Sequence, residues 1–152
     1  MTPYFQLGAA RLYQPDAVLK ERLPAGTGEL AAYTKTLVWT CTRYFGYYAQ
    51  AFGDLGLFLG VGLKAGGRAK VWCDVIDGSL PADVYEVLLE LLNGAGTNVR
   101  PTTTGPVALA LEGRLGAGPR GPFPELPTAW RSVVLNRPLL IPDDLFPEVF
   151  PE

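Results

Sequence analysis

Two apolar runs separated by glycine constrain the fold of this chain more than any other feature of its sequence. The runs cover residues 57–64 and 68–76, and Ala65-Gly66-Gly67 lies between them. Glycine between two short apolar runs is typical of a β-hairpin. The longest apolar run extends only over residues 55–63, whereas a membrane-spanning helix needs about 20 residues. We therefore expect a hairpin within a globular sheet and no insertion into a membrane.

A long helix is expected before the hairpin, over residues 29–52. Its apolar residues recur at steps of three and four, which is the period of one helix face. The alternative is a strand, because residues 36–45 are rich in β-branched and aromatic side chains. The length of the pattern favours the helix. The predicted buried face consists of Leu37, Cys41, Tyr44, Tyr48 and Phe52, with Val38 and Phe45 beside it.

Two shorter helices are expected on either side of these elements. Pro15 and Asp16 suit the first turn of a helix over residues 16–23. Asp77-Gly78 closes the hairpin, and Pro81 suits the first turn of a helix that ends at Asn93-Gly94. The residues predicted to be buried on this second helix are Val84, Val87, Leu88, Leu91 and Leu92.

The remaining segments complete an α+β reading of the chain. Residues 107–112 predict a strand with Val107, Leu109 and Leu111 on one face, and residues 1–14 contain the alternation of a weaker first strand. Residues 113–127 are rich in Gly and Pro and predict a surface loop. A short helix over 129–135 and an extended tail over 138–152 follow.

These elements predict a small antiparallel sheet with one long and two or three short helices packed on it. The 152 residues are 48% hydrophobic, enough to form a core. The length fits one domain, and no internal repeat or linker divides it. We therefore expect a single α+β domain over residues 1–152.

Composition excludes several classes of function. The chain has no histidine, which removes Ser-His-Asp and Cys-His catalysis and His-ligated metal sites. The net charge is −2 and the 13 basic residues are scattered, which disfavours nucleic acid as a partner. Asp74 and Asp77 are three positions apart, which puts them on opposite faces of a regular strand, and Asp77 suits a turn before Gly78, so they do not predict a catalytic pair. The sequence therefore predicts no cofactor and leans away from an enzyme.

The glycines of the first hairpin strand raise the alternative of a dinucleotide-binding site. Gly60 and Gly62 lead into a strand, whereas a dinucleotide site requires glycines that lead into a helix. Lys64 and Arg68 flank the hairpin tip, where they could bind an anion or simply be solvated charges.

Cys41 and Cys73 are expected to be buried free thiols. Because the N-terminus lacks a secretory signal, we expect a cytoplasmic protein; a disulfide in an exported protein is the alternative.

Two side-chain patterns predict a binding surface. Trp39, Arg43 and Tyr47 recur at i, i+4 and i+8 on the long helix, and these three residue types dominate protein-interface hot spots. Burial of the helix on both sides is the competing interpretation. Asp83, Glu86 and Glu90 share one face of the later helix. They suit a basic partner or a divalent cation, and a solvated face is the ordinary alternative.

One resemblance to a known family accompanies these patterns. The strand, turn and helix over residues 71–92, followed by the strand at Val107, resemble the C-terminal domains of TonB-type energy-transducing envelope proteins. The resemblance covers about a third of the chain and rests on the order of the elements. It implies an envelope domain, which is one alternative function.

The sequence thus favours a non-enzymatic protein that binds one protein partner stoichiometrically, like an immunity or adaptor protein. The predicted contact residues are Trp39, Arg43, Tyr47, Asp83, Glu86 and Glu90. The alternative is an enzyme or ligand binder that uses carboxylates. In that case the site is expected between the acidic helix face and the 113–127 loop.

Overall fold

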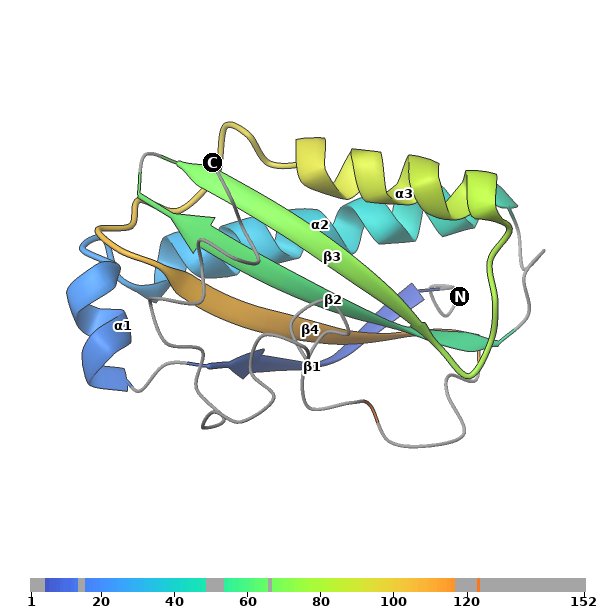
Figure 1. Ribbon diagram of the computed structural model, residues 1–152, viewed down its shortest axis with the longest axis horizontal. Helices are drawn as coiled ribbons and strands as arrows, with labels where there is room; N and C mark the ends of the chain where they lie inside the picture. The colour runs from blue at the N-terminus through green and yellow to red at the C-terminus, as the bar shows by residue number, and fades with distance from the viewer. Residues whose placement is uncertain (1–4, 14–15, 49–53, 66, 117–122, 124–152) are drawn as a thin grey trace.

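A computed structural model describes residues 5–13, 16–48, 54–65, 67–116 and 123. For Tyr47 and Tyr48 it describes the backbone alone. The elements are, in chain order, β1 (Phe5–Leu12), α1 (Asp16–Arg22), α2 (Thr27–Tyr48), β2 (Leu55–Lys64), β3 (Arg68–Ile76), α3 (Ala82–Gly94) and β4 (Val107–Leu115) (Figure 1). The predicted α+β fold is confirmed.

The four strands form one antiparallel sheet in the order β1-β4-β2-β3. The hairpin of β2 and β3 has the expected register, with Val61 opposite Val71. β4 pairs with β2 on one side and with β1 on the other, so Leu59 and Ala10 both lie opposite Leu111. The first and last strands are therefore neighbours, and β1 and β3 form the two edges of the sheet.

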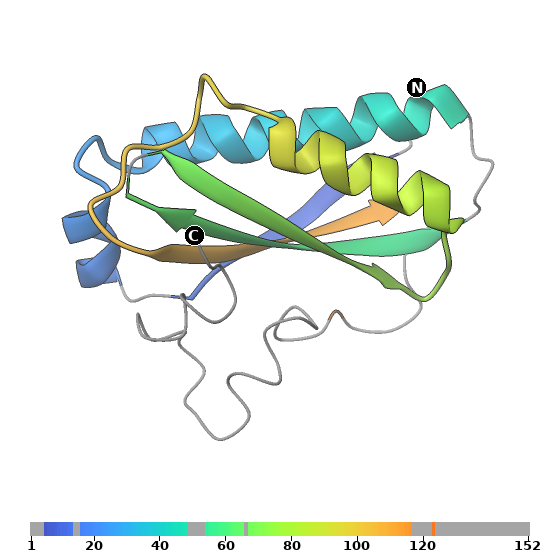
Figure 2. The ribbon, with the colours of Figure 1, turned by 45° about the horizontal axis from the view of Figure 1, so that its top comes forward.

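Both long helices lie on the same face of the sheet (Figure 2). The buried line of α2 consists of Leu30, Tyr33, Leu37, Cys41 and Phe45, at steps of three and four. Phe45 rather than Tyr44 continues this line, since Tyr44 is half-buried. The core between helices and sheet also contains Leu57, Leu59, Val61, Leu63, Leu88, Leu92, Val107, Leu109 and Leu111.

Threonine hydroxyls explain how α2 tolerates its β-branched residues. The hydroxyls of Thr36, Thr40 and Thr42 donate to the carbonyls four residues earlier, at 2.9–3.0 Å. These bonds satisfy the hydroxyls inside the helix, although such residues are otherwise weak helix formers. The choice of helix over strand for residues 36–45 is thereby confirmed.

The opposite face of the sheet has small side chains at its centre. Side chains alternate along a strand, so Gly56, Gly60 and Gly62 of β2 lie on the face away from the helices, beside Ala108 and Ala110 of β4. Every residue of β2 is buried. On this same face Phe58 packs against Phe123, with ring centroids 6.2 Å apart. Burial on both faces explains why the second strand has no polar alternation.

Glycine is required in β4 where the first strand crosses it. Gly113 lies in register with Leu7, and a Cβ at Gly113 would overlap the ring of Phe5. Phe5 is 2% exposed and stacks on Phe45 at 6.3 Å between ring centroids. The missing side chain of Gly113 thus makes room for the aromatic ring that attaches β1 to the core.

The structure corrects two sequence predictions. β4 continues to Leu115, so residues 113–115 belong to a strand and not to the predicted loop. Val87 and Leu91, predicted to be buried, are 45% and 44% exposed. α3 contacts the core through a narrower stripe than its apolar sequence suggests. The predicted helix at 129–135, the tail at 138–152 and nearly all of the remaining loop lie outside the described residues.

Of the helices in the described ranges, none has both the length and the apolar character needed to cross a bilayer.

Candidate protein-binding site

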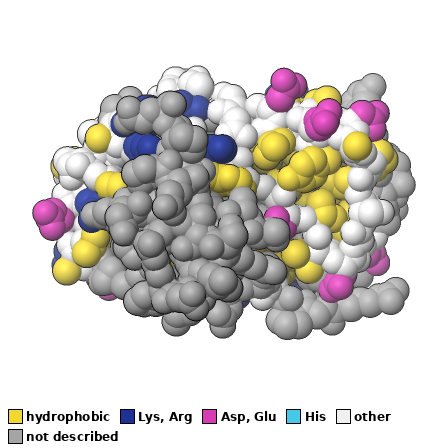
Figure 3. All heavy atoms as spheres, in the orientation of Figure 1, with side chains coloured by type: hydrophobic (Ala, Val, Ile, Leu, Met, Phe, Trp, Pro, Cys, Tyr) yellow, Lys and Arg dark blue, Asp and Glu magenta, His cyan; other side chains and the backbone are white. Residues whose placement is uncertain are grey.

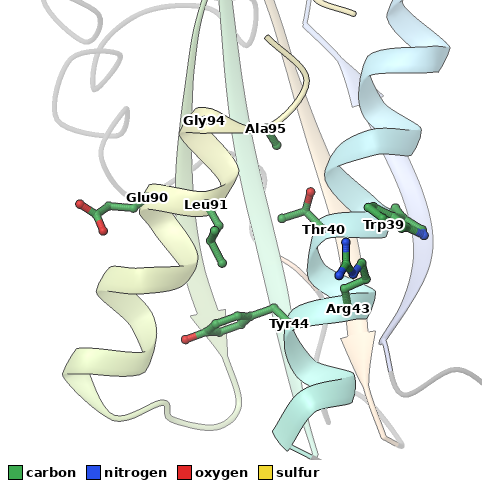
Figure 4. A pocket seen from close by; sticks show the side chains of 8 residues that line it. All are labelled: Trp39, Thr40, Arg43, Tyr44, Glu90, Leu91, Gly94 and Ala95. Atoms are coloured by element: carbon green, nitrogen blue, oxygen red, sulfur yellow. The ribbon is translucent and has the colours of Figure 1, made fainter. Parts of the chain in front are cut away.

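An open groove between α2 and α3 contains several of the residues that the sequence singles out. Trp39, Thr40, Arg43 and Tyr44 line it from α2, and Glu90 and Leu91 line it from α3 (Figure 4). Gly94 and Ala95 line its end at the C-terminus of α3. Its volume is about 630 Å³, within the range of sites that hold a side-chain cluster or a small ligand.

Trp39 is the most exposed large apolar side chain of the described residues, at 57%. The guanidinium of Arg43 lies 4.7 Å from the centre of its ring, a cation–π distance. This stacking holds both long side chains on the outer surface of α2. The competing interpretation, burial of this helix on both sides, therefore does not hold for the part around Trp39.

A hydrogen bond fixes the separation of the two helices. The Tyr44 hydroxyl donates to the carbonyl of Val84 at 3.0 Å, which connects α2 to the first turns of α3. Tyr44 also packs edge-on against Phe45 in the core. Tyr44 thus connects the two helices that form the groove to each other and to the core.

The acidic residues occupy the outer surface of α3. Asp83, Glu86 and Glu90 are all exposed, and α3 contains no basic residue. Glu90 lines the groove, whereas Glu86 lies on a second hollow that Val87, Leu89, Glu90 and Asn93 also line. Within the described ranges, no three acidic, cysteine or histidine side chains are grouped so that they could hold a metal ion.

Apolar side chains extend this surface beyond the groove. In the space-filling view they gather on the side of the molecule where α3 and the end of β3 lie, and acidic side chains border them (Figure 3). The exposed members on α3 are Val87 and Leu91. The partly buried ones on β3, α3 and the turn between them are Val75, Leu80, Tyr85 and Leu89.

The structure brings Trp39, Arg43 and Glu90 together in one groove. Asp83 and Glu86 lie on α3 outside it, and the side chain of Tyr47 lies outside the described residues. Sequence reasoning missed Leu91 and Val87. The available signal was the width of the apolar arc on α3, which exceeds the roughly 100° that one packed helix face needs.

The cysteines are free thiols and both are buried. Burial raises the pKa of the Cys41 thiol to about 12. Burial also raises the pKa of Cys73, and the neighbouring Cys41 and Asp74 raise it further. The alternative of a Cys41–Cys73 disulfide does not hold in this structure, and both thiols remain protonated at neutral pH.

The other candidate motifs have structural roles. Gly60 and Gly62 lie inside β2 opposite Trp72 and Lys70, so they do not form a phosphate-binding loop. Asp77 has a φ of 53° in the turn before α3, as expected of an Asp-Gly turn. At the hairpin tip, the Arg68 Nε donates to the carbonyl of Ala65 at 3.1 Å.

Comparison with known proteins finds no match to a protein-family model, to a curated protein or to a solved structure.

Proposed function

We propose that this chain binds a protein partner stoichiometrically, in the manner of an immunity or adaptor protein, through the groove between α2 and α3. The observation that supports this most is the exposed Trp39 under the Arg43 guanidinium. Both side chains line the same open groove as Leu91 of α3. Tryptophan and arginine are the residue types on which protein interfaces most depend.

The charges around the groove indicate the chemistry of the partner. Asp83, Glu86 and Glu90 give α3 three exposed carboxylates with no cation on the same helix. A partner with an apolar side chain for the groove and Lys or Arg beside it would complement this surface. Such complementarity mainly accelerates association and excludes wrong partners.

The test begins with the isolation of a partner from the native host by tagged pull-down, followed by titration calorimetry on the purified pair. We expect Trp39→Ala to weaken binding about 30-fold, because truncation of a hot spot costs about 2 kcal/mol. Arg43→Lys keeps the charge but loses the planar stacking, so its effect should be smaller. Glu90→Lys should mainly slow association.

The matched control is Lys20→Ala, since Lys20 is exposed on α1 at the far end of the molecule (Figure 1). It should leave the affinity unchanged. If a captured partner binds Trp39→Ala and Leu91→Ala as tightly as the natural chain, and both variants are folded, the groove is not the binding site.

A further inference from the structure

The first strand leaves one side of its backbone outside the sheet. The N–H of Tyr13, directly after β1, donates to the carbonyl of Ala108 at 3.1 Å. Hydrogen-bonded and non-hydrogen-bonded pairs alternate in an antiparallel ladder. Ala10 and Leu12, which lie opposite Leu111 and Leu109, therefore direct their N–H and C=O groups away from β4. In the described part of the chain no side chain bonds to these groups.

The side chains of β1 do not protect this edge. All residues from Gln6 to Ala10 are exposed, and Leu7 and Leu12 are 42% and 46% exposed. Edge strands are usually protected by free charges, proline or bulges. Arg11, the one charged residue of β1, is neutralised by Glu112 at 2.5 Å. A bulge lies between Leu7 and Ala9, so the strand is regular from Ala9 onward.

The opposite edge is covered by α3. The side-chain amide of Asn93 accepts from the N–H of Val71 at 2.8 Å and donates to the carbonyl of Val71 at 3.0 Å. The Tyr85 hydroxyl donates to the carbonyl of Cys73 at 2.6 Å. Asn93 thus bonds to β3 as a neighbouring strand would. Among the described residues, the sheet consequently has a covered edge at β3 and an edge at β1 that no side chain covers.

We infer that two copies of this chain pair through β1, antiparallel and about a two-fold axis, so that their sheets become continuous. A second copy is the occupant that fits best for two reasons. Its β1 brings no net charge to the contact, since each Arg11 is already paired within its own chain. Pairing also uses the accessible edge of both molecules, so assembly stops at two copies and does not continue into a filament.

The register follows from the size of the side chains. A two-fold axis at Arg11 would crowd its two long side chains at a non-hydrogen-bonded pair, where the Cα atoms are only about 4.5 Å apart. An axis at Ala10 places each Arg11 opposite Ala9 of the second copy, and Leu12 opposite Gly8. The pairing involves no residue of the α2–α3 groove, so it is independent of the proposed partner binding.

Sedimentation equilibrium on the full chain tests this inference. We expect a dimer for the natural chain, and for Ala10→Pro a dimer at least about tenfold weaker. Proline there removes an N–H that faces away from the sheet, which edge strands tolerate, and each dimer loses this bond twice. Ala10→Ser keeps the N–H and should remain a dimer. Ala10→Lys places two like charges directly opposite each other across the axis and should also dissociate, which guards against misfolding of the proline variant.

Disulfide cross-linking tests the register. With the axis at Ala10, the two Cα atoms of Ala10→Cys lie about 5.5 Å apart, within the roughly 4.4–6.8 Å of a disulfide. The buried native thiols do not interfere. We expect Ala10→Cys to form a covalent dimer and Leu12→Cys to form none. A natural chain that sediments as a monomer, or a dimer that Ala10→Pro and Ala10→Lys both leave intact, would overturn the inference.

Discussion

The two edges of the sheet differ in which groups form hydrogen bonds with their outward N–H and C=O groups. On β3, side chains of α3 take the place of the missing strand: Asn93 bonds to both groups of Val71, and Tyr85 bonds to Cys73. On β1, the described chain brings no such group to Ala10 or Leu12. Burial raises the pKa of Tyr85, so its hydroxyl keeps the proton that it donates. Within the described residues, side chains of the same chain therefore satisfy the edge at β3, whereas none does so at Ala10 and Leu12 of β1.

The largest effect is expected when the hydrogen bonds between α3 and the edge of β3 are removed. Asn93→Leu deletes three hydrogen bonds, two to Val71 and one to Leu89, and leaves the groups of a buried residue unpaired. We expect the free energy of unfolding in urea to fall by about 3 kcal/mol. Amide exchange at Val71 should accelerate as well.

Two further variants define this effect. Asn93→Asp retains an acceptor for the Val71 N–H and should lose less stability than Asn93→Leu. Tyr85→Phe removes a single bond to the same edge and should cost about 1 kcal/mol. If Asn93→Leu unfolds at the same urea concentration as the natural chain, α3 does not hold the edge of β3.

The next largest effect is expected when β1 is loosened from β4. Gly113→Ala would push a methyl group into the ring of Phe5, and such overpacking costs about 2 kcal/mol. Urea unfolding should show this loss. Phe5→Ala in the same chain removes the overlap, so the two substitutions should not be additive. Additive losses would show that Phe5 and Gly113 do not share this contact.

The smallest effect concerns the reactivity of thiols at the two edges. Cys73 on β3 is 5% exposed and should not react with a thiol reagent at pH 8 in the native protein. A cysteine at Leu12, which is 46% exposed on β1, should react rapidly with little change in stability. Equal reaction rates of the two thiols would contradict the conclusion that α3 covers β3 while the side chain at position 12 of β1 is exposed.

The raised pKa of Cys41, about 12 when folded against 9.0 for a free thiol, adds a pH dependence. Above about pH 9 the unfolded thiol loses its proton and the buried thiol does not, so the unfolded state is favoured. Stability from this group should be complete below pH 9 and decrease toward pH 12, by at most about 1.4 kcal/mol per pH unit. Cys41→Ala should show a shallower decrease in urea unfolding between pH 9 and pH 10.

The hairpin and the buried stripes of α2 and α3 follow from local patterns, because glycine position and helical period act over a few residues. The exposure of Val87 and Leu91 does not, since it depends on how far α3 leans over β3. Likewise, Trp39 and Glu90 are 51 positions apart in the sequence, and only the packing of the helices brings them to one groove.

The role of Asn93 shows the limit most clearly. Its position before a glycine predicts the end of a helix, and α3 does end at Gly94. No local sequence pattern predicts that the Asn93 side chain bonds to Val71, 22 residues earlier. The hydrogen bonds between α3 and the edge of β3 depend on the tertiary arrangement, in which α3 lies along β3.

The pairing of β1 with β4 also sets an order of assembly. The β2–β3 hairpin and α3 are contiguous in the chain, so their contacts form across short loops. β1 must wait for residues 107–115, about a hundred positions later, and long loops close slowly. During synthesis the first strand therefore stays without its partner until nearly the last described residues have left the ribosome, and its incorporation completes the sheet.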